Sequence, residues 1–246
     1  MKRTFYTIAL GLLCSSAALA DEVSTCNIPA ATVGIVQSKL ATVINYPDHN
    51  GGLFKPNRMW SAIVDRKGQI CSVINSGNDP WPGSRAIAIA KAGTANDFSN
   101  SALALSTANL YGPTQPGGSL YGLNNSNPFN PDYLAQGSLS QGSFAVASNS
   151  HDDGYSSPKV PGGVITFGGG VALYQNGQVI GALGVSGDTS CADHAIAYRM
   201  RHLAGLDKTI PGGSTSDNIS YYPTAAVDPS QFKQPHCLGA GTDIVP

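Results

Sequence analysis

The chain has 246 residues, of which only 12% are charged, and its formal net charge is −1. This length fits one domain, or one domain with a long insertion. No basic run occurs, which argues against nucleic acid as a partner. The 29 glycines and 16 prolines are typical of an exported protein with long ordered loops, and less typical of a helical intracellular one.

Residues 1–20 have the pattern of a secretory signal peptide. Lys2 and Arg3 precede a short apolar stretch over residues 5–13, and a small-residue cleavage site follows at 18–20. The apolar stretch is shorter than the ~20 residues that cross a bilayer, so a membrane anchor is disfavoured. We therefore expect cleavage before Asp21 and a periplasmic or secreted mature protein that does not span a membrane.

A lipid anchor at Cys14 is the alternative for this segment. It is disfavoured because Leu13 stands where a lipid-attachment site requires a small residue. Without Lys2 and Arg3, 12 basic residues remain against 15 acidic ones, so the mature protein is slightly acidic.

The mature chain keeps four cysteines, and an even number in an exported chain favours two disulfides. The count alone leaves three connectivities open. Chain position favours one of them, because Cys191 begins the last predicted helix and Cys237 lies on a tail that must return to the body of the protein. We predict Cys191–Cys237 and, for the remaining two, Cys26–Cys71.

The first half of the mature chain predicts a helix, a hairpin and two more helices. Apolar residues recur at helical spacing over 29–44. Residues 59–75 are typical of two strands with a tight reversal at 65–68, where Gly68 supplies the positive φ. An alanine-rich helix follows over 85–98, able to approach a sheet closely, and a further helix is expected over 101–111.

Residues 112–163 are rich in Gly, Ser, Asn and Pro and have no persistent periodicity, so we interpret them as a long loop insertion within a single domain of residues 21–246. Three strands are then expected at 164–167, 171–174 and 178–187, the last two joined by a type I′ turn at Asn176-Gly177.

The last predicted helix covers 191–204. Ser190 is its expected N-cap, with Asp193 completing a capping box, and Gly205 ends it. Residues 207–246 form a Pro- and Gly-rich tail. The order of these elements favours an α+β sandwich with an antiparallel sheet of about five strands flanked by helices.

Common catalytic motifs are absent from the sequence. Gly168-Gly169-Gly170 lacks the G-K-[ST] ending of a P-loop, and the glycines more simply indicate a tight bend or a close approach to the backbone. His151-Asp152-Asp153 has metal-ligand chemistry, but such a loop triplet is usually solvated, so no metal site is assigned. Lys91, surrounded by small residues, either lines a pocket and attracts a carboxylate or extends to solvent.

Several segments together resemble the GlcG/HbpS-like family of haem-degrading or haem-binding domains. They are a V-D-x-x-G hairpin, a K-A-x-T-A helix, a G-G pair, a G-A-x-G-V-S-G strand and an acidic residue in the last helix. In this chain they fall on Val64, Asp65 and Gly68; Lys91, Ala92, Thr94 and Ala95; Gly169 and Gly170; residues 181–187; and Asp193. The match covers roughly residues 30–110 and 163–206.

The resemblance implies a profilin-like sandwich that assembles into homo-oligomers and binds haem or another small molecule, in some members beside a sensor kinase. The chain departs from the family pattern at Val171, where a proline is common, and in its longer insertion. Both changes border the expected pocket between the Lys91 helix and the glycine bend, with Ser186 and Asp193 at its rim.

Three functions follow from this resemblance. The first is an exported protein that binds haem or a similar planar acidic ligand, with His194 or His49 as the iron ligand. The second is an enzyme acting on a small oxygenated metabolite, with Asp193 as general base and Lys91 holding a carboxylate. The third is a structural or sensory partner of a membrane sensor, which needs no pocket.

Overall fold

The computed structural model describes residues 26–54, 58–76, 82–128, 145–146, 162–222, 232–237 and 243–246. The expected signal segment and the His151 triplet lie outside these residues, as does most of the expected insertion. Within the described part of the chain, no helix is both long enough and apolar enough to cross a membrane.

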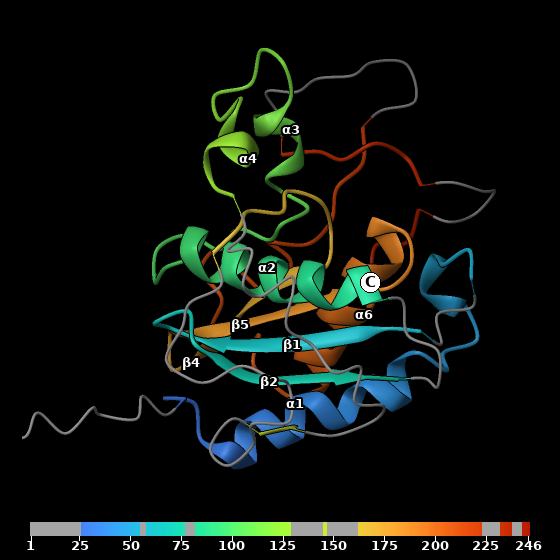
Figure 1. Cartoon of the computed structure of the whole chain (residues 1–246), viewed down its shortest axis with the longest axis vertical. Coiled ribbons are helices and arrows are strands. Elements are labelled where there is room, and N and C mark those ends of the chain that lie inside the picture. The colour runs from blue at the N-terminus through green and yellow to red at the C-terminus, as the bar shows by residue number, and fades with distance from the viewer. Residues whose placement is uncertain are drawn as a thin grey trace, which may run out of the picture.

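The centre of the molecule is an antiparallel sheet (Figure 1). It has the strand order β3-β2-β1-β5-β4, and each pair of neighbours is antiparallel. The strands are β1 (Trp60–Asp65), β2 (Ile70–Asn75), the two-residue β3 (Ala145–Val146), β4 (Gly170–Gln175) and β5 (Gln178–Ser186). The expected α+β fold with an antiparallel sheet is therefore confirmed.

Both predicted hairpins are present. The Gly68 amide donates to the Asp65 carbonyl and Gly68 has a φ of 79°, so the glycine supplies the left-handed conformation of this turn. Asn176 and Gly177 both have positive φ, 52° and 75°, as a type I′ turn between β4 and β5 requires.

Helices cover both faces of the sheet. Helix α2 (Pro82–Phe98) lies on one face and α1 (Ala30–Val43) on the other (Figure 1). The alternation along β1 explains both contacts. Ile63 joins the core formed with α1 and α6 (Ser190–Leu203), whereas Ala62 and Val64 pack beneath α2.

Small residues bring α2 very close to the sheet. A Cβ atom added to Gly184 would lie 2.0 Å from the Ala88 carbonyl oxygen and 2.5 Å from the Ala92 amide nitrogen. No side chain larger than hydrogen therefore fits at this point of β5. The prediction that the alanine-rich helix approaches a sheet closely is confirmed.

The prediction of a helix over residues 101–111 is wrong. Only Tyr111–Thr114 (α3) is helical, and residues 101–110 form turns and irregular chain. The Asn100 side chain accepts from the amides of Ala102 and Leu103, and the Ser99 hydroxyl exchanges bonds with Leu105. These side-chain bonds replace the helical ones. Two further short helices are η1 (His49–Gly51) and α4 (Leu123–Ser126).

The prediction of a strand over residues 164–167 is also wrong. This segment pairs with side chains instead of a neighbouring strand: the Ile165 amide donates to Thr94, and the Thr166 hydroxyl bonds to Thr114 and Asn124. The fifth strand is β3, which lies within the region interpreted as a long loop.

The last helix begins with a different cap from the one expected. Thr189 is its N-cap, since the Thr189 hydroxyl accepts from the Ala192 amide, and Ser190 is already helical. Gly205, with a φ of 70°, ends the helix as predicted.

Two disulfides attach the segment before α1 and the tail after α6 to this core. Cys26, just before α1, is bonded to Cys71 of β2. Cys191, in the first turn of α6, is bonded to Cys237 of the tail. This is the pairing expected from the chain positions.

Candidate ligand site

The Lys91 side chain forms a buried ion pair with Asp193. Its ammonium donates to an Asp193 carboxylate oxygen at 2.7 Å and to the Val185 carbonyl at 3.1 Å, and both side chains are almost wholly inaccessible. Lys91 thus reaches from α2, past the end of β5, to the first turn of α6. The expectation that Lys91 and Asp193 border one site is consistent with this geometry.

Burial shifts the ionisation of both partners. Desolvation lowers the pKa of Lys91, although the Asp193 charge opposes this shift. Desolvation likewise raises the pKa of Asp193 to about 6, against the lowering effect of Lys91. A carboxyl group with a pKa near neutrality beside a desolvated amine is an arrangement found at functional sites more often than elsewhere.

The glycine bend makes room for Lys91. A Cβ atom at Gly169 would lie 2.8 Å from the Lys91 ammonium nitrogen, and one at Gly170 would lie 2.4 Å from the Lys91 carbonyl oxygen. Of the two interpretations of these glycines, the close approach to the backbone therefore applies. It is the protein's own lysine that approaches, so in this conformation Lys91 fills the space expected for a ligand.

Phe167 covers the ammonium on the remaining side. Its ring centroid lies 4.8 Å from the Lys91 nitrogen, which is cation–π distance, while Phe167 itself is 36% exposed. The pair is thus wholly buried, but it lies against a side chain that is open to solvent. Ser186, the other predicted rim residue, is buried at the end of β5 opposite Trp60, one residue beyond Val185.

Asp188 connects the pair to a neighbouring loop. The Asp188 amide donates to the second Asp193 oxygen at 3.0 Å. The Asp188 carboxylate accepts from the amides of Leu53 and Phe54, each at 2.9 Å. The loop that follows η1 is therefore clamped to the start of α6.

His194 is fully buried. Its Nε2 lies 3.1 Å from the Ile219 amide nitrogen and 3.2 Å from the Asn218 side-chain oxygen, whereas its Nδ1 has no hydrogen-bond partner. Desolvation lowers the pKa of His194 to about 4, which keeps the ring neutral. The tail and the Gly168 bend pack around it, so it does not reach solvent.

His49 lies in a different environment. It is exposed in η1, between Asp48 and Asn50, which both bond to Arg199 of α6. The same loop continues to Leu53 and Phe54, large apolar residues that are 45% and 68% exposed.

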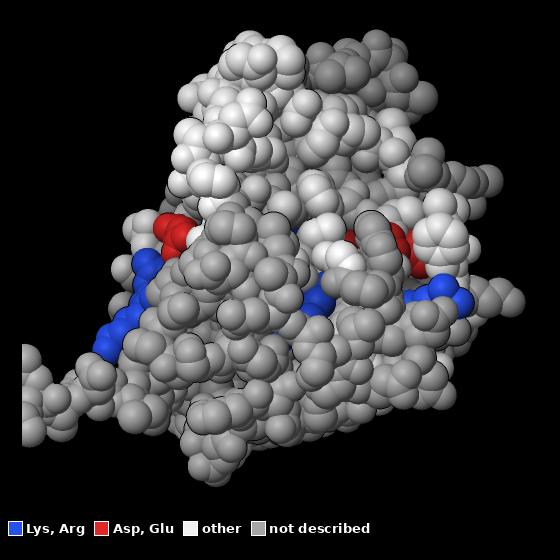
Figure 2. Space-filling view, viewed as in Figure 1, with Lys and Arg blue, Asp and Glu red and all other residues white. Residues whose placement is uncertain are grey.

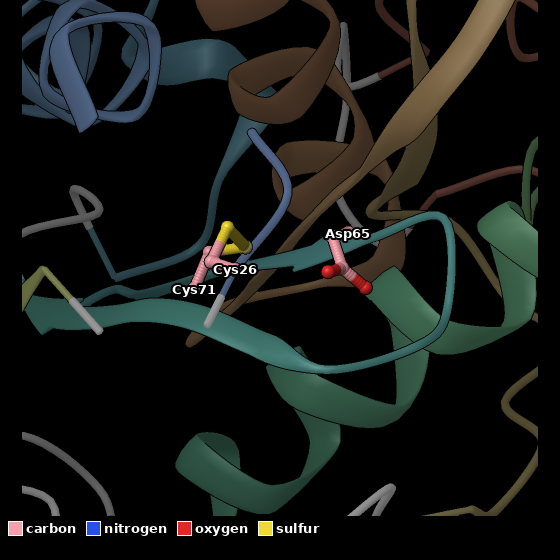
Figure 3. Close-up of side chains that lie close together, drawn as sticks. All are labelled: Cys26, Asp65 and Cys71. Atoms are coloured by element: carbon pink, nitrogen blue, oxygen red, sulfur yellow. A yellow bond between two sulfur atoms is a disulfide. The ribbon is translucent and has the colours of Figure 1, made fainter. Parts of the chain in front are cut away.

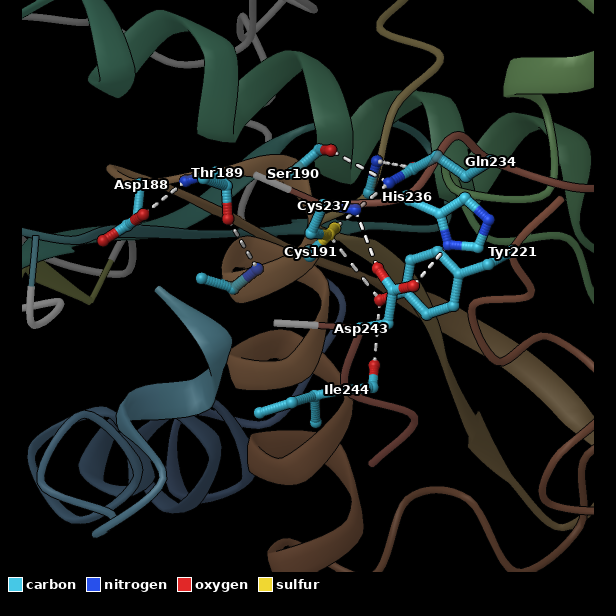
Figure 4. Close-up of a disulfide and its surroundings, with 12 residues drawn as sticks. Asp188, Thr189, Ser190, Cys191, Tyr221, Gln234, His236, Cys237, Asp243 and Ile244 are labelled. Carbon is cyan, nitrogen blue, oxygen red and sulfur yellow. Dashed lines mark hydrogen bonds and ion pairs between the residues drawn. A yellow bond between two sulfur atoms is a disulfide. The ribbon is translucent and has the colours of Figure 1, made fainter. Parts of the chain in front are cut away.

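Gln234 is a contact residue that the sequence did not indicate. Its side-chain oxygen accepts from the Gly168 amide at 3.1 Å, and its side-chain nitrogen donates to the Ser190 hydroxyl at 2.9 Å. Figure 4 shows this bridge beside the Cys191–Cys237 bond. No local pattern could have identified Gln234, because both partners are distant in sequence.

One group of potential metal ligands occurs among the described residues, formed by Cys26, Asp65 and Cys71 (Figure 3). The two sulfur atoms are bonded to each other, so neither is available as a thiolate. The Asp65 carboxylate is already occupied by amide donors, including those of Asn27 and Gln69. This group is therefore structural.

Charged side chains on the face seen in Figure 2 are few and of both signs. The described Lys and Arg residues visible there form no continuous basic patch. The buried Lys91–Asp193 pair and the adjoining His49 loop are therefore taken as the candidate site.

The family model described as haem degrading protein HbpS-like matches residues 55–201, more than half of the chain. The protein belongs to this family, as the sequence motifs indicated. No curated protein matches.

Two solved structures are similar to the chain. A crystal structure of the Klebsiella pneumoniae protein ORFY is 23% identical, with a TM-score of 0.48, and the match covers 74% of this chain and 93% of that one. The crystal structure of a PduOC–haem complex is 22% identical, also with a TM-score of 0.48, and covers 72% and 94%.

Proposed function

We propose that this protein is an exported binding protein for haem or a similar planar, acidic small molecule. Membership of the HbpS-like family supports a haem-related role. The observation that carries the proposal is the loop clamped by Asp188, where the exposed His49 precedes the exposed Leu53 and Phe54, beside the buried Lys91–Asp193 pair.

Haem requires an accessible donor for iron, apolar contacts for its faces and cations for its propionates. His49 offers an exposed imidazole, Leu53 and Phe54 offer apolar surface, and Arg199 lies beside His49 with its guanidinium paired to Asp48 and bonded to Asn50. His194 fits this role less well, since its Nε2 is occupied and its ring is buried. When bound, haem would supply its iron chemistry, and the protein would orient it.

Export agrees with the chemistry of the cysteines. Two disulfides persist in an oxidising compartment and are rare in the cytosol. We accordingly propose that residues 1–20 are cleaved and that the mature protein is periplasmic or secreted. From the family resemblance we further propose that residues 21–246 form a single domain with a profilin-like architecture, and that this domain forms homo-oligomers.

An enzyme acting on a small oxygenated metabolite is the second candidate. It is favoured by the pKa of Asp193, about 6, which is close to the value suited to a general base at neutral pH. Turnover of a candidate acid that is lost in Asp193→Asn, in a variant that remains folded, would support this function.

Haem titration of the oxidised mature protein tests the first proposal. We expect a saturable Soret shift that His49→Ala abolishes and that His202→Ala, a change of another exposed histidine, leaves unchanged. Loss of the shift in His194→Ala alone would move the iron ligand to the buried ring. A wild-type protein that gives no shift would contradict haem binding.

A further inference from the structure

The C-terminal tail crosses the candidate site and bonds to both elements that enclose the Lys91–Asp193 pair. Gln234, itself 2% exposed, bridges the Gly168 amide and the Ser190 hydroxyl. Gly168 adjoins Phe167, which covers the Lys91 ammonium, and Ser190 lies one turn before Asp193 in α6. The Gln234 side-chain amide therefore links the segment that contains Phe167 to the first turn of α6.

The backbone of Gln234 is fixed as well as its side chain. The Gln234 amide donates to the Ser220 carbonyl, and the Gln234 carbonyl accepts from the Tyr222 amide, both at 2.8 Å. The tail is thus paired to the segment that follows α6. That segment is anchored in turn by the buried ion pair between Arg201 and Asp217, whose two guanidinium–carboxylate bonds measure 2.5 and 2.7 Å.

The disulfide lies three residues beyond this bridge. Cys237 is bonded to Cys191, the neighbour of Ser190, so the covalent bond and the Gln234 bridge secure the same stretch of tail to the same turn of α6 (Figure 4). The Cys237 amide also donates to Asp243, and the Tyr221 hydroxyl donates to the Ile244 carbonyl. The described tail residues therefore form a connected strap over the start of α6.

We infer that this strap keeps the Lys91–Asp193 site closed: Gln234 holds the Phe167–Gly168 segment against α6, and the Cys191–Cys237 bond holds Gln234 in place. Release of the strap frees the Gly168 amide and lets Phe167 move from the ammonium. The strap then controls access of a small anionic ligand, whose carboxylate would replace Asp193 as the partner of Lys91. This inference concerns access to Lys91 and does not depend on haem being the ligand.

Access to Lys91 can be measured directly. Full-length mature protein is treated with acetic anhydride, and acetylation at each lysine is followed by mass spectrometry. In the wild type we expect slow acetylation of Lys91, because it is buried, and fast acetylation of the exposed Lys67 as an internal reference. Gln234→Ala should raise the Lys91 rate about tenfold relative to Lys67, since a buried bridging group is lost.

The two disulfides provide a matched control. They close loops of nearly equal length, with sequence separations of 45 and 46 residues, so their removal affects the unfolded chain similarly. Cys191→Ser/Cys237→Ser should accelerate Lys91 acetylation as Gln234→Ala does. Cys26→Ser/Cys71→Ser should leave the Lys91 rate near that of the wild type under conditions in which all variants remain folded.

Hydrogen exchange of the peptide containing residues 167–170 gives an independent reading, because the Gly168 amide donates directly to Gln234. Exchange should accelerate in Gln234→Ala and remain slow in Gln234→Glu, which keeps the acceptor.

Equal Lys91 acetylation in the wild type, Gln234→Ala and Cys191→Ser/Cys237→Ser would overturn the inference. An equal increase in both disulfide variants would also overturn it, because global opening would then explain the result.

Discussion

At the scale of single residues, the distinctive feature is a lysine and an aspartate that are ionisable, paired and removed from water. Desolvation disfavours both charges, and only their mutual attraction and a few fixed donors and acceptors offset that cost. A buried ion pair of this kind therefore contributes little to the net stability of the fold. This is in keeping with the proposed role of Lys91 as the partner of a charged ligand.

Removing one partner should expose this cost. Lys91→Met should lower the free energy of unfolding at pH 7 by about 3–5 kcal/mol, because it leaves the Asp193 carboxylate buried without its cation. Urea denaturation measures the loss. Lys91→Met/Asp193→Asn, which removes both charges, should recover part of it.

The loss of stability in Lys91→Met should shrink as the pH falls towards 6. Lys91 lowers the pKa of Asp193, so without it the folded carboxyl takes up a proton above the wild-type value of about 6, whereas the unfolded carboxyl titrates near 3.8 in both proteins. Above pH 6 only the variant gains stability from this proton, and below pH 6 the wild-type carboxyl takes it up as well, so the difference between the two proteins stays constant. A loss that does not change between pH 9 and pH 6 would contradict the assignment.

His194 should act in the opposite direction. Its folded pKa, about 4, is below the ordinary value of 6.5, so the unfolded state binds the extra proton between those values. The stability contributed by the neutral ring is complete above pH 6.5 and is lost as the pH falls towards 4, by about 3 kcal/mol. His194→Gln keeps an acceptor for the Ile219 amide and should remove this part of the pH dependence in urea denaturation. An unchanged pH slope would be inconsistent with a buried neutral ring.

At the scale of elements, the contact of α2 with the sheet determines where Lys91 lies. The helix approaches closely enough for Lys91 to reach α6 because glycine and alanine line the contact. A larger residue at the contact would displace α2 and move the ammonium away from Asp193.

Two glycine substitutions separate this effect from helix propensity. Gly184→Ala should destabilise by about 3 kcal/mol or more, because its Cβ atom would lie 2.0 Å from the Ala88 carbonyl oxygen. Gly93→Ala, within α2 and with nothing within 4 Å of its added Cβ, should stabilise by about 0.5–1 kcal/mol. Urea denaturation of the two variants should give shifts of opposite sign. Equal shifts would show that the contact is looser than described.

Elements with strong local signals could be predicted from the sequence, and those decided by distant partners could not. The Asn176-Gly177 hairpin and the alanine-rich helix are encoded by residues within each element. The segment 164–167 has strand-like composition, but its bonds go to Thr94, Thr114 and Asn124, so no ladder forms.

The candidate site, too, could be predicted from the sequence only in part. The family motifs predicted that Lys91, the glycine bend and Asp193 border one site. The position of the Lys91 ammonium depends on a salt bridge to Asp193, 102 residues away, and the Gln234 bridge depends on a hydrogen bond from the Gly168 amide, 66 residues away. Neither contact has a local signature in the sequence.

At the scale of the whole molecule, the protein is a helix-covered sheet to which disulfides attach the segment just before α1 and the tail after α6. Each bond closes a loop of about 45 residues and so removes about 4 kcal/mol of chain entropy from the unfolded state in the loop-closure model. One bond secures the start of α1, and the other secures the tail over the site. The same covalent chemistry thus serves the stability of the fold and the closure of the site.

The most direct test of the proposed function is native mass spectrometry of the protein recovered from outside the cytoplasm. We expect a chain that begins at Asp21, contains both disulfides and carries a non-covalent ligand with the mass of haem or of a similar planar acid, lost on denaturation. A chain that retains Met1, or one that carries no small molecule and takes up none when haem is added, would contradict it.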